Sequence, residues 1–486
     1  MSKIIKNSNE SYKLYISKGI KHANDGNLNT AEKFFLDAIS INKESHQAYI
    51  NLSNIYILQN RNDRFVKLIF NYLSKYEFNE ELINYSSKIM YNYRLDKELK
   101  KLFIVSKLHL KDNNKEKHYL FFTQGKLFER EENISEAIKS YSKAILCNKQ
   151  FFESYIKLFN LLEKSNEINK LKSLINQALK YFNNNDKINL LLLYKSIYLN
   201  REKKFKESQI LIIKHNLNLE LKNKEKFYLR LLDLESKNLE KLKKYNLAYN
   251  KVEERNYLLE NIDDNHKYNG LNILDSITKY KKFYTKKNFK LISDKTDVSI
   301  QNQLVFMIGF PRSGTTLLDT ILRTHSKIKV LEEKPFILNL RHDYFKKNQN
   351  DLSRILNITK KEKNFIRKSY YKKIFTDKVD YNKVIIDKFP LSIIELGFIK
   401  CIFPESKIIL AMRHPCDVVT SCFFSLFTIN DAMVNFLKWE KTINFYNQVF
   451  DLFDFYEKEL ELNYLMIKYE NTVNNFKKEV KSMLEY

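Results

Sequence analysis

Between residues 300 and 415, short apolar runs alternate with stretches in which apolar residues recur at helical spacing. The runs lie at 304–308, 384–386 and 408–412. Helical spacing follows the first run and recurs over residues 391–402. Short apolar runs separated by helices are typical of parallel strands that are buried on both faces. This part of the chain is therefore predicted to be an α/β domain with a parallel sheet.

The earlier part of the chain differs in its helix-breaking residues. All five prolines lie between residues 311 and 415, so the first 310 residues contain none. A proline in the interior of a helix costs about 3 kcal/mol, and a tract without proline therefore favours continuous helices. This change in composition predicts a boundary near residues 290–300, between an all-α part and the α/β domain.

A pattern of small and aromatic residues occurs twice in the all-α part, at an offset of 106 residues. The first copy consists of Gly19, Asn27, Ala31, Phe35, Ala38 and Asn42, and the second of Gly125, Asn133, Ala137, Tyr141, Ala144 and Asn148. Small residues at matched positions let two antiparallel helices approach closely, and the aromatic residue fills the groove between them. Weaker copies follow each one after roughly 34 residues, which predicts a series of helix-turn-helix units.

Spacing and residue types in this part resemble the tetratricopeptide repeat over about residues 10–215. The resemblance implies a helical array over residues 1–215 whose concave surface binds a protein partner or supports the neighbouring domain. Residues 216–298 are charged and helix-prone, and we interpret them as a connector ending in the basic and aromatic run 280–287. Such a run can bind nucleic acid, but we interpret it as a solvated helix face with buried aromatics, and no nucleic-acid partner is expected.

The sequence GFPRSGTT, residues 309–316, follows the first apolar run and precedes a helix. Gly309 and Gly314 allow successive amides to converge on an anion at the helix start, where the helix dipole adds positive potential. The glycine spacing matches the nucleoside-triphosphate loop GxxxxGK(S/T), but Thr315 occupies the position of the lysine that reaches the β- and γ-phosphates. The loop is therefore predicted to bind a shorter anion, such as one phosphate that carries one sulfuryl group.

Cations follow three of the predicted strands: Arg312 in the loop, Lys388 after the second run and Arg413 after the third. Ligands of parallel α/β sheets bind outside the carboxyl ends of the strands, so these side chains are expected to converge on one crevice that holds an anion. Ser421 lies eight residues beyond Arg413, on a helix that Pro415 is well placed to begin. An arginine and a hydroxyl at this spacing can share one phosphate.

PRSGTTLL resembles the 5′-phosphosulfate loop of sulfotransferases, and RHPCDVVTS resembles their 3′-phosphate motif. The likeness to tyrosylprotein sulfotransferases and to bacterial tetratricopeptide-repeat sulfotransferases covers about residues 300–475. It implies a P-loop-like sulfotransferase domain over residues 299–486 that uses 3′-phosphoadenosine-5′-phosphosulfate (PAPS) as co-substrate and needs no metal. The nucleotide contacts that it implies come from Arg312, Ser313, Gly314, Thr315, Thr316, Arg413 and Ser421.

The same resemblance implies catalytic residues. Glu333, 21 residues after the loop arginine, stands at the position of the catalytic base of tyrosylprotein sulfotransferases, and Lys388 in DKFP corresponds to the lysine of their Asn-Lys-Asp-Pro segment. Glu333 is expected to accept a proton, while Lys388 and Arg312 neutralise charge on the leaving phosphate and the transferring group. The implied reaction is sulfuryl transfer to a hydroxyl of a peptide, a protein tyrosine or a glycan.

The sequence departs from that pattern in two places. Leu331 occupies the position of the glycine expected before the glutamate pair, and Glu332, expected to point to the other side of its strand, precedes Glu333. The sequence also stops at Tyr486, where relatives continue. The domain is therefore expected to be either a C-terminally truncated fragment or a short member of the family.

Two other functions stay open at this point. Val384–Asp387 resembles a magnesium-binding strand end after a phosphate loop, which would make the domain a phosphotransferase (kinase), although the loop lacks the lysine of that class. The other alternative is a non-catalytic tetratricopeptide-repeat scaffold that binds an anionic partner.

Charge and cysteine content limit the partners and the cellular compartment that we expect. Lys and Arg total 84 against 58 Asp and Glu, and the net charge of +26 favours anionic partners without identifying one. The four cysteines form no CxxC pair, and the sequence shows neither a leader pattern nor an apolar stretch long enough for a membrane span. We therefore expect a cytoplasmic protein.

Overall fold

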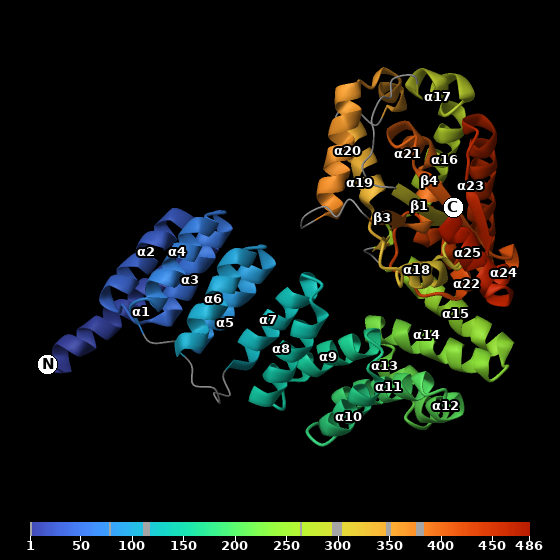
Figure 1. The fold of residues 1–486 in the computed structure, drawn as a ribbon. Helices are drawn as coiled ribbons and strands as arrows, with labels where there is room; N and C mark the ends of the chain where they lie inside the picture. Colours follow the sequence, from blue (N-terminus) through green and yellow to red (C-terminus); the bar gives the residue numbers. More distant parts are fainter. Residues whose placement is uncertain are drawn as a thin grey trace. The chain divides into compact units, whose positions relative to one another are not determined.

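The computed structural model describes residues 2–76, 79–109, 117–262, 265–293, 304–346, 351–375 and 383–486 (Figure 1). The chain divides into two compact units, Met1–Lys224 and Glu225–Tyr486. Within the described ranges, unit 1 consists of helices and their connections, whereas unit 2 combines helices with a β-sheet. None of the helices in these ranges combines the length and the apolar character that crossing a lipid bilayer requires.

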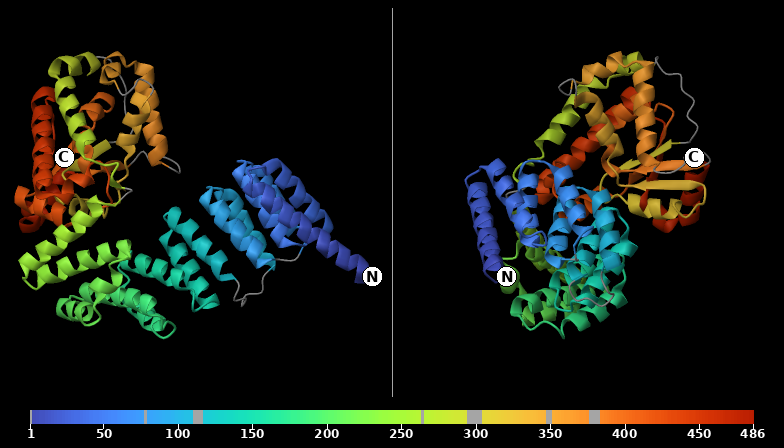
Figure 2. Two further views of the ribbon diagram at one scale, coloured as in Figure 1. Left: turned by 180° about the vertical axis from the view of Figure 1, so that it is seen from behind. Right: turned by 90° about the vertical axis from the view of Figure 1, so that its left-hand side faces the viewer.

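Unit 1 is a series of helical hairpins, as the repeat pattern predicts (Figure 1 and Figure 2). Three residues join the two helices of each hairpin. The pairs are α1(Ser2–Asn24) with α2(Leu28–Ile41), α3(His46–Leu58) with α4(Asn62–Leu73), α5(Glu80–Asn92) with α6(Asp96–His109), α7(His118–Arg130) with α8(Ile134–Cys147), α9(Phe152–Lys164) with α10(Ile168–Ala178), and α11(Asn185–Arg201) with α12(Phe205–Lys214). A short helix, α13(Leu217–Leu221), follows them.

The middle residue of each three-residue connection has a left-handed backbone. These residues are Gly26, Asn60, Arg94, Glu132, Asn166 and Lys203, with φ between 56° and 78°. The N–H of the next residue bonds to a carbonyl near the end of the preceding helix, as in Asn27 to His22 (2.8 Å) and Arg61 to Tyr56 (2.7 Å). This is the Schellman arrangement, which satisfies the last carbonyls of a helix. Because only the first of these residues is a glycine, the repeat of the turn is hard to see in the sequence.

The close helix packing that the repeated glycines predict is confirmed. A Cβ atom on Gly19 would lie 2.5 Å from Cε1 of Phe35, and one on Gly125 would lie 2.6 Å from Cε1 of Tyr141. The small residues on the second helix of each hairpin are fully buried: Ala31, Ala38, Ala137 and Ala144. An aromatic ring therefore lies directly against the backbone of the facing helix in both copies.

Unit 2 begins with four helices before its sheet. They are α14(Glu225–Lys241), α15(Tyr245–Glu260), α16(Leu271–Phe283) and α17(Lys286–Ser293). α14 and α15 form another hairpin with a three-residue connection, whose middle residue, Lys243, has φ 61°. The hairpin geometry therefore continues beyond residue 215, although the sequence of residues 216–290 shows no clear period.

The sheet is parallel and five-stranded, in the order β2-β3-β1-β4-β5, which confirms the predicted α/β domain. Its strands are β1(Leu304–Gly309), β2(Ile328–Glu332), β3(Val384–Lys388), β4(Lys407–Met412) and β5(Leu465–Lys468). The register pairs Met307 with Lys388 and Gly309 with Ala411. The carboxyl ends of β1, β3 and β4 therefore share one edge of the sheet.

Helices and 3₁₀ segments connect these strands and follow the last one. They are α18(Thr315–Leu322), α19(Phe336–Phe345), η4(Leu352–Asn357), α20(Lys360–Ile374), η5(Pro390–Ile393), α21(Leu396–Ile402), α22(Pro415–Phe424), η6(Met433–Leu437), α23(Trp439–Leu460), α24(Tyr469–Asn474) and α25(Phe476–Glu485). The helix expected over residues 391–402 is thus two segments, η5 and α21. α22 has Pro415 in its first turn, as predicted.

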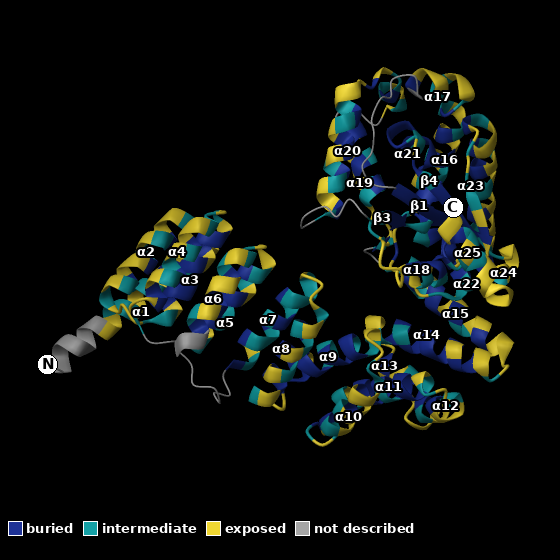
Figure 3. Cartoon of the chain, in the orientation of Figure 1, coloured by how far each residue is buried: buried dark blue, intermediate teal, exposed yellow. Residues whose placement is uncertain are grey.

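The core of unit 2 takes in helices that precede the sheet in the sequence (Figure 3). Tyr280 and Tyr284, from the basic and aromatic run, are buried in the same cluster as Phe306 and Leu410 of the strands. A Cβ atom on Gly397 would lie 2.5 Å from Cδ2 of Tyr284. These two aromatics are buried as expected, and α16 packs in the core of unit 2. Residue 298 lies outside the described ranges, so the boundaries at 215 and 298 stay a prediction.

Replacing Gly125 by alanine is expected to lower the free energy of unfolding of unit 1 by about 1–2 kcal/mol. Overpacking against a buried ring costs about 1–3 kcal/mol, which outweighs a gain in helix propensity of up to about 1 kcal/mol. Urea unfolding followed by circular dichroism measures the loss. Gln124→Ala, one residue earlier on α7, is the control, and Tyr141→Leu should recover part of the loss. Equal stability of the two alanine variants would contradict the tight packing.

Candidate active site

The loop between β1 and α18 adopts a conformation that depends on its glycines. Gly314 has φ 97°, and a Cβ atom there would lie 2.7 Å from Cδ2 of Tyr469. A Cβ atom on Gly309 would lie 2.6 Å from the carbonyl oxygen of Ala411 on the neighbouring strand. The loop therefore leads directly into α18, whose first N–H groups have no acceptor within their own helix. Free amides and the helix dipole make this end suitable for an anion.

A cavity of about 400 Å³ lies over this loop, within the size range of pockets that hold small ligands. Predicted site residues form one part of its wall: Arg312, Gly314, Thr315, Thr316, Glu333 and Arg413. Larger side chains form another part: Phe389, Leu391, Phe427, Met433 and Tyr469. The fold thus brings together, at one cavity, predicted site residues that are up to 101 positions apart in the sequence.

Ser313, Lys388 and Ser421 lie around this cavity rather than on its wall. Ser313 is 2% exposed, and its Oγ atom lies under the loop beside Gly309. Within the described part of the chain, this buried hydroxyl has no hydrogen-bond partner. A buried polar atom without a partner is costly, so this hydroxyl is available to a ligand of the loop.

Arg312 follows β1 and Arg413 follows β4, and both line the cavity. Arg312 donates a hydrogen bond from Nε to Oγ of Ser421 (2.9 Å). Arg413 lies over the ring of Tyr469, 4.7 Å from its centroid, and its Nη2 atom lies 3.3 Å from a carboxylate oxygen of Asp417. The loop arginine thus extends across to α22, and the sharing of one phosphate by Arg413 and Ser421 stays a prediction.

Lys388 is fully buried at the end of β3, among three carboxylates. Its Nζ atom lies 2.8 Å from Oε1 of Glu333, 3.6 Å from Oδ2 of Asp319 and 3.8 Å from Oε1 of Glu332. Asp319 is also fully buried, and it accepts two hydrogen bonds from Arg323 at 2.7 and 2.6 Å. A buried ammonium group is tolerated only with such partners. The cluster therefore fixes the position of Lys388 behind the cavity wall.

Glu333 reaches the cavity because the chain turns sharply after β2. Its φ is 49°, and its N–H donates to the carbonyl oxygen of Lys388 (2.8 Å). A left-handed glutamate is strained, and such strain is often found at functional sites. The backbone irregularity thus occurs at Glu333 itself, two residues after Leu331, where a glycine was expected.

The position of Glu332 differs in part from the expectation that its side chain points to the other side of the strand from Glu333. Glu332 is outside the cavity wall, but its carboxylate accepts a hydrogen bond from Arg323 (2.9 Å) and lies near Lys388. Hydrogen bonding to Arg323 lowers the pKa of Glu332, and Lys388 contributes. The reason is that β2 ends at Glu332, so the alternation of a strand no longer decides where the next side chain lies.

A second cavity, of about 410 Å³, adjoins the first and shares Phe389, Leu391 and Met433 with it. Residues before the sheet form part of its wall: Tyr268, Asn272, Ile273 and Ser276. The ion pair between Arg341 and the buried Glu395 (3.0 Å) also lines it. The two cavities are therefore separated by a partition of apolar side chains.

Asp387, the carboxylate that a phosphotransferase would use for magnesium, is not at the cavity. It is 1% exposed and accepts a hydrogen bond from the hydroxyl of Tyr370 (2.7 Å). Burial raises the pKa of Asp387 to about 7, although the bond from Tyr370 acts in the opposite direction. Adjacent residues of a strand point to opposite faces, so Lys388 and Asp387 have different surroundings.

Four residues that shape the site were given no role by the sequence: Asp319, Arg323, Tyr469 and Glu470, although the last two lie in a segment, 467–471, that resembles Arg-Tyr-Glu-Asp-Leu of tyrosylprotein sulfotransferases. Glu470 accepts a hydrogen bond from the N–H of His414 (2.9 Å), at the start of α22. The signal available for Asp319 and Arg323 was their spacing, four residues apart on a helix, which is typical of an ion pair. The contact of Tyr469 with Gly314 has no local signal, because the two residues are distant in the sequence.

Residues 304–486 match the sequence profile described as a sulfotransferase family. Protein-tyrosine sulfotransferase A of Caenorhabditis elegans is 27% identical over 192 residues, which cover 37% of this chain and 49% of the nematode protein. An uncharacterized protein of Aquifex aeolicus (strain VF5) is 27% identical over 145 residues, which cover 28% of this chain and 19% of that protein. The chain thus spans less than half the length of these curated relatives. The C-terminal part is a sulfotransferase-family domain, as its two motifs predicted.

Solved structures with similarity to this chain include repeat proteins. Pseudomonas aeruginosa pilF is 16% identical with a TM-score of 0.35, covering 47% of this chain and 99% of its own. A tetratricopeptide repeat protein from Parabacteroides merdae is 12% identical with a TM-score of 0.32, covering 52% of this chain and 94% of its own. The apo form of RapI is 15% identical with a TM-score of 0.36, covering 74% and 98%. The description of unit 1 as helical hairpins rests on its own geometry.

Asp387→Asn is expected to gain stability relative to the wild type as the pH rises. A carboxyl group whose pKa is raised from 3.8 to about 7 by folding contributes stability below pH 4 that is lost as the pH rises through 7. The difference in free energy of unfolding should therefore grow by up to about 4 kcal/mol between pH 4 and pH 8. Urea unfolding at both pH values measures it. Asp343→Asn, at an exposed ion pair, is the control. A difference that does not change with pH would contradict the protonated state.

Proposed function

We propose that unit 2 is a PAPS-dependent sulfotransferase that acts on a hydroxyl group. One observation carries the proposal: Arg312, Arg413 and the N-terminus of α18 surround a cavity that Glu333 also enters. The residues present fit such a nucleotide, because the Ser313 hydroxyl is buried without a partner among the described residues and the cavity wall offers Arg312, Thr315 and Arg413 to its anionic groups. PAPS, when bound, supplies the sulfuryl group and leaves as adenosine 3′,5′-bisphosphate.

The loop and α22 would divide the binding of the two phosphate groups. The amides at the start of α18, the hydroxyls of Thr315 and Thr316, and Arg312 would hold the 5′-phosphosulfate. Arg413, which precedes α22, would bind the 3′-phosphate together with Ser421 of that helix. Each contact is charge-assisted, and such bonds are typically stronger than those between neutral groups.

Glu333 and Lys388 would perform the chemistry as a pair. The acceptor oxygen forms a bond to sulfur while the bond from sulfur to the 5′-phosphate oxygen breaks, and Glu333 takes the proton of the acceptor hydroxyl. Lys388, 2.8 Å from Oε1 of Glu333, orients this carboxylate and offsets negative charge as it develops. Arg312 would likewise offset the negative charge that develops on the leaving phosphate.

The phosphotransferase alternative has less support. Thr315 replaces the lysine that contacts β- and γ-phosphates, and Asp387 is bonded to Tyr370 and buried away from the cavity. A magnesium-dependent reaction needs a carboxylate or hydroxyl that reaches both the metal and the phosphates. The position of Asp387 therefore favours sulfuryl transfer over phosphoryl transfer.

The acceptor would enter through the second cavity. Its apolar partition against the nucleotide cavity, formed by Phe389, Leu391 and Met433, allows an acceptor hydroxyl to reach the sulfuryl group while the rest of the acceptor stays outside. A peptide or protein tyrosine, or a glycan, is the acceptor that we propose, and a helical array such as unit 1 suits recognition of a protein. A cytoplasmic location stays a prediction from the sequence. Radiolabelled PAPS incubated with tyrosine peptides and glycans tests the transfer directly.

Adenosine 3′,5′-bisphosphate is expected to stabilise unit 2 against heat, because the bound anion offsets the repulsion between Arg312 and Arg413. At 100 times its dissociation constant it should add about 2.7 kcal/mol of apparent stability. Thermal unfolding with and without the ligand measures the shift, and adenosine serves as the control without phosphate. Stabilisation by ATP with magnesium but none by the bisphosphate would support the phosphotransferase. No stabilisation by either would favour the scaffold alternative.

Glu333→Gln is expected to keep nucleotide affinity and to lower turnover by about 10²–10⁴-fold, the range for a general base. Glu332→Gln is the matched control, because it lies outside the cavity wall and its main partner is Arg323. It should keep most of the activity. Turnover is measured with the radiolabelled donor, and bisphosphate binding checks the fold. A fully active Glu333→Gln would remove this residue from the mechanism.

A further inference from the structure

A charged side chain occupies a core position in α15, outside the part of the chain that matches the sulfotransferase family. The buried residues of this helix form one stripe: Ala248, Val252, Arg255, Asn256 and Leu259. Arg255 lies in the middle of the stripe and is 0% exposed. Burying a guanidinium group is costly unless every part of it is paired, so its partners decide why it is there.

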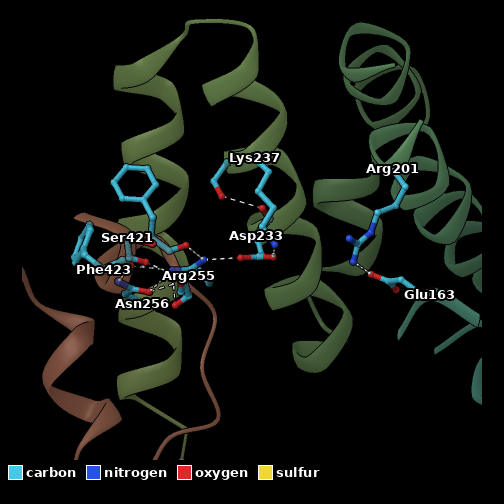
Figure 4. A network of polar contacts seen from close by, with 11 residues as sticks. Glu163, Arg201, Asp233, Lys237, Arg255, Asn256, Ser421 and Phe423 are labelled. Atoms are coloured by element: carbon cyan, nitrogen blue, oxygen red, sulfur yellow. Dashed lines mark hydrogen bonds and ion pairs between the residues drawn. The ribbon is translucent and has the colours of Figure 1, made fainter. Parts of the chain in front are cut away.

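The partners of Arg255 are a carboxylate and the end of another helix (Figure 4). Its Nη1 atom lies 2.7 Å from Oδ1 of Asp233 on α14, and 3.1 Å from the carbonyl oxygen of Phe424. Its Nη2 atom donates to the carbonyl oxygens of Phe423 (3.1 Å) and Ser425 (3.5 Å). Asn256 accepts bonds from Arg255 and donates to the carbonyl oxygen of Phe423 (3.3 Å).

These carbonyls are the C-terminal end of α22, Pro415–Phe424. The last carbonyls of a helix lack partners in their own helix, and a cation nearby stabilises them. α22 itself has no basic residue in its last turn, and the residue after it, Ser425, has an extended backbone. Ser425 satisfies the carbonyls of Ser421 and Cys422 through its Oγ and N–H groups. Arg255 provides, from another part of the chain, the donors for the last two carbonyls, of Phe423 and Phe424.

α22 also carries the residues that we assign to the 3′-phosphate. Arg413 and His414 precede its first turn, and Ser421 lies on its last turns, where Figure 4 shows it beside the Arg255 network. Ser421 accepts the hydrogen bond from Arg312 of the phosphate loop. A shift or fraying of the capped end would displace Ser421 and loosen the start of the same helix. The cap thus acts on the cavity without touching it.

We propose that Arg255 is a positioning residue for the 3′-phosphate, and that the hairpin α14–α15 is consequently part of the nucleotide site. The inference rests on the proposed function, because it assigns a nucleotide to the cavity. It extends the site to residues 225–260, which lie before the family match at residue 304. Asp233 keeps Arg255 oriented by its ion pair, and Asn256 completes the cap.

Arg255→Met in the full chain tests the proposal with two nucleotides. Binding of adenosine 3′,5′-bisphosphate should weaken by about tenfold to a hundredfold, the size expected when one charge-assisted hydrogen bond to the 3′-phosphate is lost. Binding of adenosine 5′-monophosphate, which lacks the 3′-phosphate, should change less than about threefold. Isothermal titration calorimetry measures both dissociation constants, at a temperature where circular dichroism shows the variant folded.

Arg367→Met is the matched control. Arg367 is also buried, donates from Nε to the carbonyl oxygen of Ile402 at the end of α21 (2.6 Å), and pairs with Glu405 (3.1 Å). It therefore caps a helix in the same way, but that helix carries none of the residues assigned to the nucleotide. Arg367→Met should lose similar stability and keep the preference for the bisphosphate.

The outcomes separate this inference from the proposed function. A wild-type chain that binds neither nucleotide would overturn both. The positioning role alone would be overturned if the wild type prefers the bisphosphate and the Arg255→Met variant keeps that preference. The same holds if the variant loses affinity equally for both nucleotides. If Arg255→Met does not fold, Arg255→Lys takes its place, since lysine keeps the charge beside Asp233 but cannot reach three carbonyls. The Arg255→Lys variant should lose part of the preference for the bisphosphate over the monophosphate. An unchanged preference would contradict the proposal.

Discussion

The burial of Lys388 is the constraint on which the arrangement of unit 2 depends. A fully buried ammonium group requires carboxylates around it, and these come from two other segments: Asp319 from α18, and Glu332 and Glu333 from the end of β2. Asp319 in turn needs Arg323, which also holds Glu332. One cation thus ties β3, β2 and the helix of the phosphate loop together. The same network places the carboxylate of Glu333 at the cavity.

Buried arginines perform a related task at the helix ends. Arg255 and Arg367 each bring a guanidinium group to the last carbonyls of a helix that follows later in the sequence. Because an arginine has several donors in a fixed fork, it can satisfy carbonyls and a carboxylate at the same time. Helices α14, α15 and α20 are thereby joined to α22 and α21 by polar contacts as well as by apolar packing. A domain boundary drawn only from the family match would cut through this network.

The walls of the two cavities in unit 2 differ in chemical character. The phosphate loop and cations surround the first cavity, whereas aromatic and aliphatic side chains form most of the partition to the second. The wall of the second cavity includes Tyr268, Asn272 and Ser276, which lie before residue 304. Under the proposed function, acceptor choice would depend in part on segments outside the family match.

Local signals in the sequence were enough for many of the elements and for the phosphate loop. Apolar runs predicted β1, β3 and β4, the glycine and aromatic pattern predicted close helix pairs, and the loop and the RHPCDVVTS segment indicated the sulfotransferase-family domain and half of the residues in the cavity wall. These features depend on residues that are adjacent or one helical turn apart. Their backbone geometry is set locally, so spacing alone reveals them.

Contacts between distant segments were decided only by the tertiary structure. Ser421 accepts a hydrogen bond from Arg312, Glu332 stays near Lys388 instead of turning away, and Tyr469 closes over Gly314. The partners in each contact come from different strands and helices, and their distance depends on strand order, register and the exact end of β2. Arg255 shows this most clearly: in the sequence it is one more charged residue in a helix of mixed charge, and only folding brings it to the end of α22.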